Sequence, residues 1–378
     1  MQMLFAITAI LFAGSVLAMM HIQNSRKSLP SLAVFSLPKP EPYTVKYQVA
    51  SMTLEEKIGQ MFVVSFKGTK LDAATETWMR NLKIGGVLLL GGNVATKEQV
   101  SKLIIQLNEK VSHLSVAPLF IAVDQEGGKV SRFTFDGFEM HAQRDIGNGN
   151  DAYAVAFRRG KELKALGVNV NFSPVLDTAS SSLDFMYDRA FVGNEKDVAT
   201  YGVRMIEGYR DSGIASVAKH FPGHGGTQTN SHIELPVAVR DEELWRKHLY
   251  PFRAAIGAHV PMIMMAHIKV SNIDENYPAS LSKKIVTDIL RNGLSYDGVI
   301  VSDDLGMGAI SKKYSVAESA VRAVVAGTDI LIVVRGSETY EKMIIALEKA
   351  VKDGVISENR IDESVERILK LKHELTIL

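Results

Sequence analysis

The feature that most constrains this fold is a regular alternation, from about residue 51 onward, of short apolar runs with longer amphipathic stretches. Strands that read as continuous apolar runs are typical of a parallel sheet covered on both faces. Eight strand–helix repeats predict a single closed (β/α)8 barrel, a TIM barrel of the α/β class. The apolar runs cover residues 60–66, 86–90, 119–123, 168–175, 214–218, 261–266, 298–301 and 329–334. The helix-like stretches include 97–111, 152–166, 198–211, 242–258, 282–291 and 316–326.

An open, doubly wound sheet is the structural alternative. Eight repeats in about 320 residues favour the closed barrel over it. The absence of a G-x-G-x-x-G after the first apolar run also weakens a dinucleotide-binding interpretation. The tail 361–372 continues as a C-terminal helix, with Asp362 and Glu363 in its first turn, where carboxylates favour the helix dipole. Residues 51–378 are therefore predicted to form one domain.

The N-terminal segment 1–20 (MQMLFAITAILFAGSVLAMM) carries no charge and is long enough to span a bilayer. Its small residues Ser15 and Ala18 also suit a cleavage site. We therefore expect export, with this segment acting as a signal peptide or as an uncleaved membrane tether, and a periplasmic, cell-surface or membrane-anchored location. A buried helix is disfavoured because a helix that is apolar all round has no face for water. Residues 21–50 have prolines at positions 30, 38, 40 and 42 and read as a linker.

Composition excludes several classes of function. The chain has 43 basic and 42 acidic residues and no block of like charge, so no nucleic-acid partner is expected. It has no cysteine, which removes disulfides, thiolate catalysis and cysteine-ligated zinc.

Polar side chains follow five of the predicted strands. In a parallel barrel the active site lies at the carboxyl ends of the strands, so these residues should meet in one mouth. Carboxylates, histidines and basic groups with little aromatic content suit a polyhydroxylated ligand. Helix capping is the alternative for any one of them. The residues are Asp124, Gln125, Glu126 and Arg132 after the third strand, Asp177, Asp188 and Arg189 after the fourth, Lys219, His220 and His224 after the fifth, His267 after the sixth, and Ser302, Asp303 and Asp304 after the seventh.

Three of the ten histidines lie between positions 220 and 232, which raises the question of a metal site. Their spacings cross a glycine-rich loop rather than one face of a helix, as H-E-x-x-H would, so no metal is expected. The same loop lacks the G-K-[ST] of a phosphate-binding loop, and no cofactor is expected.

The segments 218–225 (AKHFPGHG) and 123–133 (VDQEGGKVSRF) resemble glycoside hydrolase family 3. The segments 171–177 (NFSPVLD), 188–191 (DRAF), 278–282 (PASLS) and 297–307 (DGVIVSDDLGM) belong to the same pattern, in the same order. Within the family, the chain is similar to single-domain bacterial β-N-acetylglucosaminidases, which release N-acetylglucosamine from muropeptides. The resemblance thus implies a barrel glycosidase acting on terminal β-linked N-acetylglucosamine in peptidoglycan fragments or related glycans.

The resemblance also implies a retaining, exo-acting mechanism with a glycosyl-enzyme intermediate. Asp303 matches the family's nucleophile, and strand alternation predicts that only one of Asp303 and Asp304 can enter the mouth. His232, on the loop after the fifth strand, matches the acid/base. A further set matches the positions that grip the sugar, namely Asp124, Arg132, Arg189, Lys219 and His220.

The chain departs from the family pattern at Asn230, where the family has an aspartate beside the catalytic histidine, and at Gly226. The Asn230 carbonyl can still accept a hydrogen bond, so we expect it to orient His232, but a full negative charge is lost and the acid step should weaken. An altered but active enzyme is the favoured interpretation. The alternatives are a catalytically weakened glycan-binding protein, or another family 3 specificity such as a β-glucosidase or a phosphorolytic enzyme.

Overall fold

The computed structural model describes residues 42–111, 117–179 and 181–377. The predicted signal or anchor segment 1–20 lies outside the described residues, as does the linker up to residue 41. Among the described residues no helix combines the length and apolar character that crossing a membrane requires.

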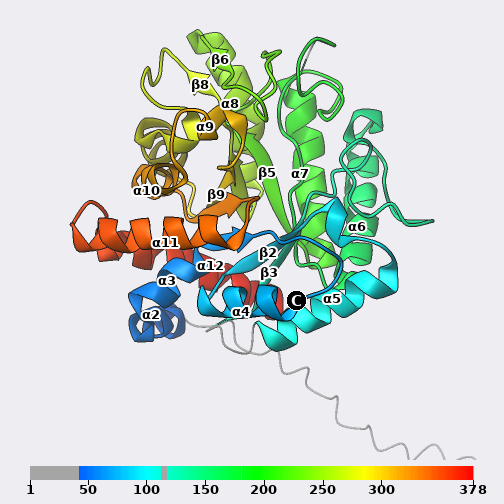
Figure 1. The fold of residues 1–378 in the computed structure, drawn as a ribbon. Coiled ribbons are helices and arrows are strands. Elements are labelled where there is room, and N and C mark those ends of the chain that lie inside the picture. The colour runs from blue at the N-terminus through cyan, green and yellow to red at the C-terminus, as the bar shows by residue number, and fades with distance from the viewer. Residues whose placement is uncertain (1–41, 112–116, 180, 378) are drawn as a thin grey trace, which may run out of the picture. The chain divides into compact units, whose positions relative to one another are not determined.

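Eight parallel strands close into a barrel, with the helices around them (Figure 1). The order around the barrel is β1-β10-β9-β7-β5-β4-β3-β2. Each strand overlaps one of the predicted apolar runs, so the predicted fold class is confirmed. The strands are β1 (Phe62–Val64), β2 (Gly86–Leu89), β3 (Phe120–Val123), β4 (Val170–Asn171), β5 (Ala215–Phe221), β7 (Met262–Met265), β9 (Val299–Asp304) and β10 (Ile330–Val333). A separate two-stranded sheet pairs β6 (Val237–Ala238) with β8 (Lys269–Val270).

The helices pack apolar faces on the barrel, and several of them begin at a residue whose side chain caps the helix. In α7 (Glu195–Ser212), for example, Asn194 and Asp197 form a capping box, and Gly213 ends the helix with a φ of 81°. Further helices are α3 (Leu54–Gln60), α4 (Ala73–Asn81), α5 (Lys97–Lys110), α6 (Gly149–Leu166), α8 (Glu242–Gly257), α9 (Gly308–Ser311), α10 (Val316–Ala326), α11 (Ser337–Lys352) and α12 (Glu358–Ile377). Short 3₁₀ turns occur at η1 (Gly91–Asn93), η3 (Gln143–Asp145) and η4 (Ala279–Leu281).

Two predicted segments differ from the structure. Residues 42–50 were expected in the linker, but α2 (Pro42–Ser51) forms there and packs against α12, burying Val45 and Val49. Proline is compatible with the first helical position, so Pro42 does not prevent this helix. The helix expected at 282–291 is a π-helix, η5 (Lys284–Gly293).

The amino ends of β9 and β10 meet at a buried carboxylate. Asp329, directly before β10, accepts the Ile300 backbone N–H at 2.9 Å and is fully buried. Three arginines bind the same carboxylate, two of them from α12, so this helix ties down the amino end of the barrel. They are Arg291 (2.7 Å), Arg360 (3.4 Å) and Arg367 (3.2 Å).

Candidate active site

A cavity of about 290 Å³ lies at the carboxyl ends of the strands. Strand side chains such as Leu88, Met264 and Ile332 contribute its apolar wall. Of the predicted site residues, those that line it are Asp124, Arg132, Arg189, Lys219, His220, His232 and Asp303; Asn230 does not. Segments far apart in the sequence therefore meet here, as the strand-end argument predicts.

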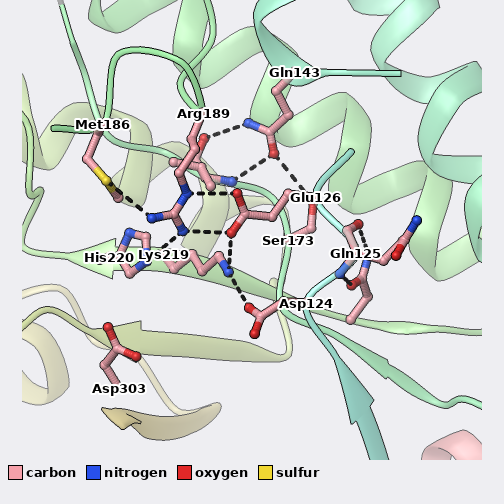
Figure 2. A network of polar contacts seen from close by, with 12 residues as sticks. Asp124, Gln125, Glu126, Gln143, Ser173, Met186, Arg189, Lys219, His220 and Asp303 are labelled. Carbon is pink, nitrogen blue, oxygen red and sulfur yellow. Dashed lines mark hydrogen bonds and ion pairs between the residues drawn. The ribbon is translucent and has the colours of Figure 1, made fainter. Parts of the chain in front are cut away.

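The centre of the site is a buried carboxylate, Glu126, just after β3 (Figure 2). Arg189 binds it with two parallel hydrogen bonds, Nε to Oε2 at 2.9 Å and Nη2 to Oε1 at 2.7 Å. Lys219, in β5, places its Nζ 2.6 Å from Glu126 Oε1 and 2.8 Å from Asp124 Oδ1. Arg132 approaches the other Asp124 oxygen at 3.5 Å. One carboxylate thus holds two of the three cations that were predicted to grip a sugar, Arg189 and Lys219.

The charges in this network stabilise one another. Burial alone would raise the pKa of Glu126, but the adjacent Arg189 and Lys219 outweigh it and hold that pKa far below its ordinary value. Burial alone would lower the pKa of Lys219, but Asp124 and Glu126 raise it. The network therefore stays ionised and presents fixed donors and acceptors to the cavity.

A second buried carboxylate, Asp177, orients His220. Its Oδ2 lies 2.7 Å from His220 Nδ1, and its Oδ1 accepts the backbone N–H of His224 at 2.5 Å. Arg189 Nη2 lies 3.4 Å from His220 Nε2 and can only donate, so His220 carries its hydrogen on Nδ1. Although burial acts to raise the pKa of Asp177, the His220 ring and the His224 N–H lower it to about 2.

Asp303 lies near the end of β9, facing the network across the cavity (Figure 2). Its Oδ1 accepts the backbone N–H of Asp304 at 2.8 Å. Burial acts to raise the pKa of Asp303, but His267, His220, the Asp304 N–H and Lys219 together lower it. The carboxylate is therefore ionised near neutral pH, as a nucleophile must be.

Both aspartates border the cavity, so the prediction that only one could do so is wrong. The register between β9 and β10 shifts between Ile330 and Ile332, which breaks strict alternation at this strand end. The two carboxylates still differ. Asp304 Oδ1 accepts the N–H groups of Gly306 at 2.8 Å and Val334 at 2.9 Å, and burial raises its pKa.

His232 is exposed at the rim of the cavity. Its ring meets Phe185 edge-on, with the ring centroids 6.4 Å apart, and its carbonyl accepts the Gly308 N–H at the start of α9 at 3.0 Å. The expected bond from Asn230 to the ring is not among the hydrogen bonds of the described residues. The Asn230 Oδ1 instead accepts the backbone N–H of His232 at 2.9 Å, a local turn that asparagine side chains favour.

The loop after β5, which carries these histidines, is anchored near its start. The fully buried Arg240 donates from Nη2 to the carbonyls of Gly223 at 2.6 Å and Gly225 at 3.2 Å, and from Nη1 to Pro222 at 3.3 Å. A Cβ on Gly225 would lie 1.8 Å from the Thr178 carbonyl oxygen, so only glycine fits there. The start of the loop is therefore fixed against its neighbours.

Several supporting residues had no role assigned from the sequence. Glu126, Asp177 and His267 stood in the predicted strand-end set, but which groups they bind depends on contacts between distant loops. Arg159 and Arg240 were missed, because a buried arginine that binds backbone carbonyls leaves no sequence pattern. Arg159, within α6, donates to the Glu126 carbonyl at 2.8 Å. In the described part of the chain, no group of three or more His, Asp or Glu side chains could hold a metal ion.

The chain matches the model of the glycosyl hydrolase family 3 N-terminal domain over residues 53–371. It is 33% identical over 327 residues to a β-hexosaminidase of Nitrosomonas eutropha, covering 83% of this chain and 92% of that protein. It is 31% identical over 334 residues to β-hexosaminidase LpqI of Mycobacterium tuberculosis, covering 85% and 84%.

Two solved structures are also similar. A family 3 β-N-acetylglucosaminidase from Paenibacillus sp. str. FPU-7 has a TM-score of 0.83 and 37% identity, over 86% of this chain. This chain spans 63% of that protein, less than two thirds of its length. A β-N-acetylhexosaminidase from Beutenbergia cavernae has a TM-score of 0.80 and 29% identity, over 85% of this chain and 99% of that one.

Proposed function

Because this chain belongs to family 3 of the glycosyl hydrolases, we propose that it is a retaining exo-β-N-acetylglucosaminidase, which removes terminal β-linked N-acetylglucosamine from glycans. The observation that carries this proposal is that the ionised Asp303 shares one cavity with the Glu126-centred network and with His232. A nucleophile, a sugar-binding wall and a proton donor are the three parts that a retaining glycosidase needs.

In this mechanism Asp303 attacks the anomeric carbon and forms a covalent glycosyl-enzyme. His232 gives a proton to the departing oxygen, then takes one from the water that releases the sugar. Asp124 accepts hydrogen bonds from sugar hydroxyls, while Arg132, Arg189 and Lys219 donate to hydroxyl oxygens and to the acetamido carbonyl.

The size of the cavity supports action at chain ends. A space of about 290 Å³ is at the lower end of ligand sites, which suits one sugar ring rather than a length of glycan. The leaving group would then lie at the rim, where His232 is exposed.

We further propose peptidoglycan fragments as the natural substrates and export as the location, with segment 1–20 as signal or tether. Incubation with purified muropeptides, followed by mass spectrometry of the released sugar, tests the first. Cell fractionation and sequencing of the mature N-terminus test the second. An intact N-terminus in the cytoplasmic fraction would contradict export.

A chromogenic N-acetyl-β-glucosaminide tests the activity, with Asp303→Asn and Asp304→Asn as matched variants. We expect Asp303→Asn to lower turnover by at least about 1,000-fold and Asp304→Asn by no more than about tenfold, because only the first removes the nucleophile. Equal losses would contradict the assignment.

The same assay separates the alternatives. Glycan binding without release by the wild-type chain would instead support a catalytically weakened binding protein, for which the missing carboxylate at Asn230 is the motivating observation. Faster release with added phosphate would indicate a phosphorolytic enzyme, and preference for a glucoside would indicate a β-glucosidase.

A further inference from the structure

His267 follows β7 and lies next to the nucleophile's strand end without lining the cavity. The ring is fully buried. Its Nε2 lies 3.0 Å from the backbone oxygen of Asp304, and its Nδ1 lies 2.7 Å from the hydroxyl oxygen of Ser280, in η4. Both ring nitrogens are therefore engaged, one by the segment that carries Asp303.

The chemistry of the two partners fixes the tautomer of this ring. A carbonyl oxygen can only accept a hydrogen bond, so His267 Nε2 must carry the hydrogen. In the neutral ring Nδ1 is then an acceptor, and the Ser280 hydroxyl must donate to it. Burial lowers the pKa of His267, which favours the neutral ring. The Asp304 carbonyl thus selects the form of the ring, and the Ser280 hydroxyl, which can donate or accept, stabilises that form by donating to Nδ1.

The side chain, the backbone carbonyl and the backbone N–H of Asp304 are all hydrogen-bonded. Its carboxylate binds two backbone N–H groups, its carbonyl binds His267, and its own N–H donates to Asp303 Oδ1 at 2.8 Å. Any rotation of the Asp304 backbone would therefore change the direction in which the Asp303 carboxylate points. A displacement of about 1 Å in a reacting group can cost about 100-fold in rate.

We propose that Ser280 and His267 form a positioning pair for the nucleophile: the serine hydroxyl donates to Nδ1 and anchors the imidazole, and the imidazole Nε2–H holds the Asp304 carbonyl so that Asp303 faces the anomeric carbon. The inference rests on the proposed function, because it needs Asp303 to be the nucleophile. Neither residue touches substrate, and both act through the Asp304 backbone.

A pair of amide substitutions separates the two ring contacts. In His267→Gln the amide reaches about as far as Nε2 and can still donate to Asp304, whereas in His267→Asn it reaches only the Nδ1 position and meets Ser280. We expect about a 100-fold fall in kcat for His267→Asn and less than about a tenfold fall for His267→Gln. Equal losses in the two variants would overturn the proposal.

A pair of serine substitutions gives the matched control. Ser280 and Ser282 are both fully buried in the same short segment, but the Ser282 hydroxyl donates to Asp274 Oδ2 at 2.6 Å. We expect Ser280→Ala to lower kcat about tenfold, the equivalent of one lost hydrogen bond, and Ser282→Ala to change only the melting temperature. These variants keep the test open if His267→Asn does not fold. A Ser280→Ala enzyme with the kcat of Ser282→Ala would overturn the proposal.

Leaving-group dependence distinguishes positioning of the nucleophile from general damage to the site. The fall in kcat caused by His267→Asn should be the same for aryl leaving groups of high and low pKa, because only the nucleophile is affected. In His232→Ala the proton donor is missing, so the fall in kcat should be greater for poor leaving groups. The inhibition constant of free N-acetylglucosamine should be the same in His267→Asn as in the wild-type enzyme, because the sugar-binding wall is intact. Weaker inhibition would overturn the proposal.

The proposed function and this inference fail in different ways. Absence of release by the wild-type chain, or an active Asp303→Asn variant, would refute the function. A wild-type enzyme that depends on Asp303 but is indifferent to His267→Asn would refute only the positioning pair.

Discussion

Two buried carboxylates lie under basic side chains at opposite ends of the same barrel. At the carboxyl end Glu126 is 2% exposed and binds Arg189 and Lys219; at the amino end Asp329 is fully buried and binds three arginines. Charge and burial alone would make the two clusters equivalent.

The clusters differ in what else their cations bind. At the amino end Arg291 also donates to the carbonyls of Tyr296 at 2.6 Å and Gly298 at 2.8 Å. These N–H groups are therefore bound to the protein's own backbone rather than directed at a ligand. At the carboxyl end Arg189 and Lys219 border a cavity that Asp303 also borders. A buried charge cluster therefore indicates a site only where it faces space that a ligand can fill.

The largest expected effect is on activity, from Glu126→Gln. Without the central charge the two cations lose their fixed positions, and we expect kcat/KM per folded molecule to fall about 1,000-fold, the equivalent of about 4 kcal/mol. Steady-state kinetics with a chromogenic substrate, corrected for the folded fraction, measure this. A fall in kcat/KM of less than tenfold would contradict the assignment of the Glu126 cluster to function and of the Asp329 cluster to structure.

The matching change at the amino end, Asp329→Asn, should act on stability alone. Leaving three arginines around a neutral amide should lower the free energy of unfolding by about 3 kcal/mol. Urea unfolding measures that loss, and kcat/KM of the folded enzyme should stay at the wild-type value. Lost activity in a fully folded Asp329→Asn protein would contradict the assignment of this cluster to structure.

A smaller effect should appear as a dependence of stability on pH at the carboxyl end. The folded pKa of Asp177, about 2, lies below its ordinary 3.8, so the unfolded chain takes up the proton first as pH falls. The contribution of this group is complete above about pH 4 and is lost toward pH 2, in total about 2 kcal/mol. Asp177→Asn keeps an acceptor for His220 but should flatten this dependence in urea titrations from pH 2 to 6. If the free energy of unfolding of Asp177→Asn depended on pH in the same way as that of the wild type, ionisation of Asp177 would not be coupled to folding.

The smallest expected effect is at the exposed rim. Asn230→Asp adds a charge two residues before His232, which should raise kcat a few-fold and move the alkaline limb of the pH–rate profile upward. Thr229→Asp, with the same charge one residue away, is the control. Unchanged kinetics in Asn230→Asp would show that the rim histidine does not depend on its neighbour.

The strands and the mouth could be predicted because they depend on local patterns. A buried parallel strand needs a continuous apolar run, and the residue after it must lie at the carboxyl edge. The sequence pattern therefore predicts that Asp124, Lys219 and Asp303 lie at the same end of the barrel, although it does not predict which groups they bind.

What could not be predicted depends on competition between partners. Glu126 borders the cavity, but its carboxylate oxygens bind two cations from distant parts of the chain, Arg189 and Lys219. The Asn230 side chain was expected to bind the imidazole of His232, but its Oδ1 accepts a hydrogen bond from the His232 backbone N–H instead. The helix at 42–51 was missed because its stability comes from packing on α12, at the other end of the chain.

The most direct test is to trap the covalent intermediate. The wild-type enzyme would be incubated with a slow fluorinated N-acetylglucosaminide, digested and examined by mass spectrometry. We expect one added glycosyl group, located by fragmentation on Asp303. Turnover of that substrate with the sugar attached to another residue, or with no adduct at any time point, would contradict the assignment of Asp303 as the nucleophile.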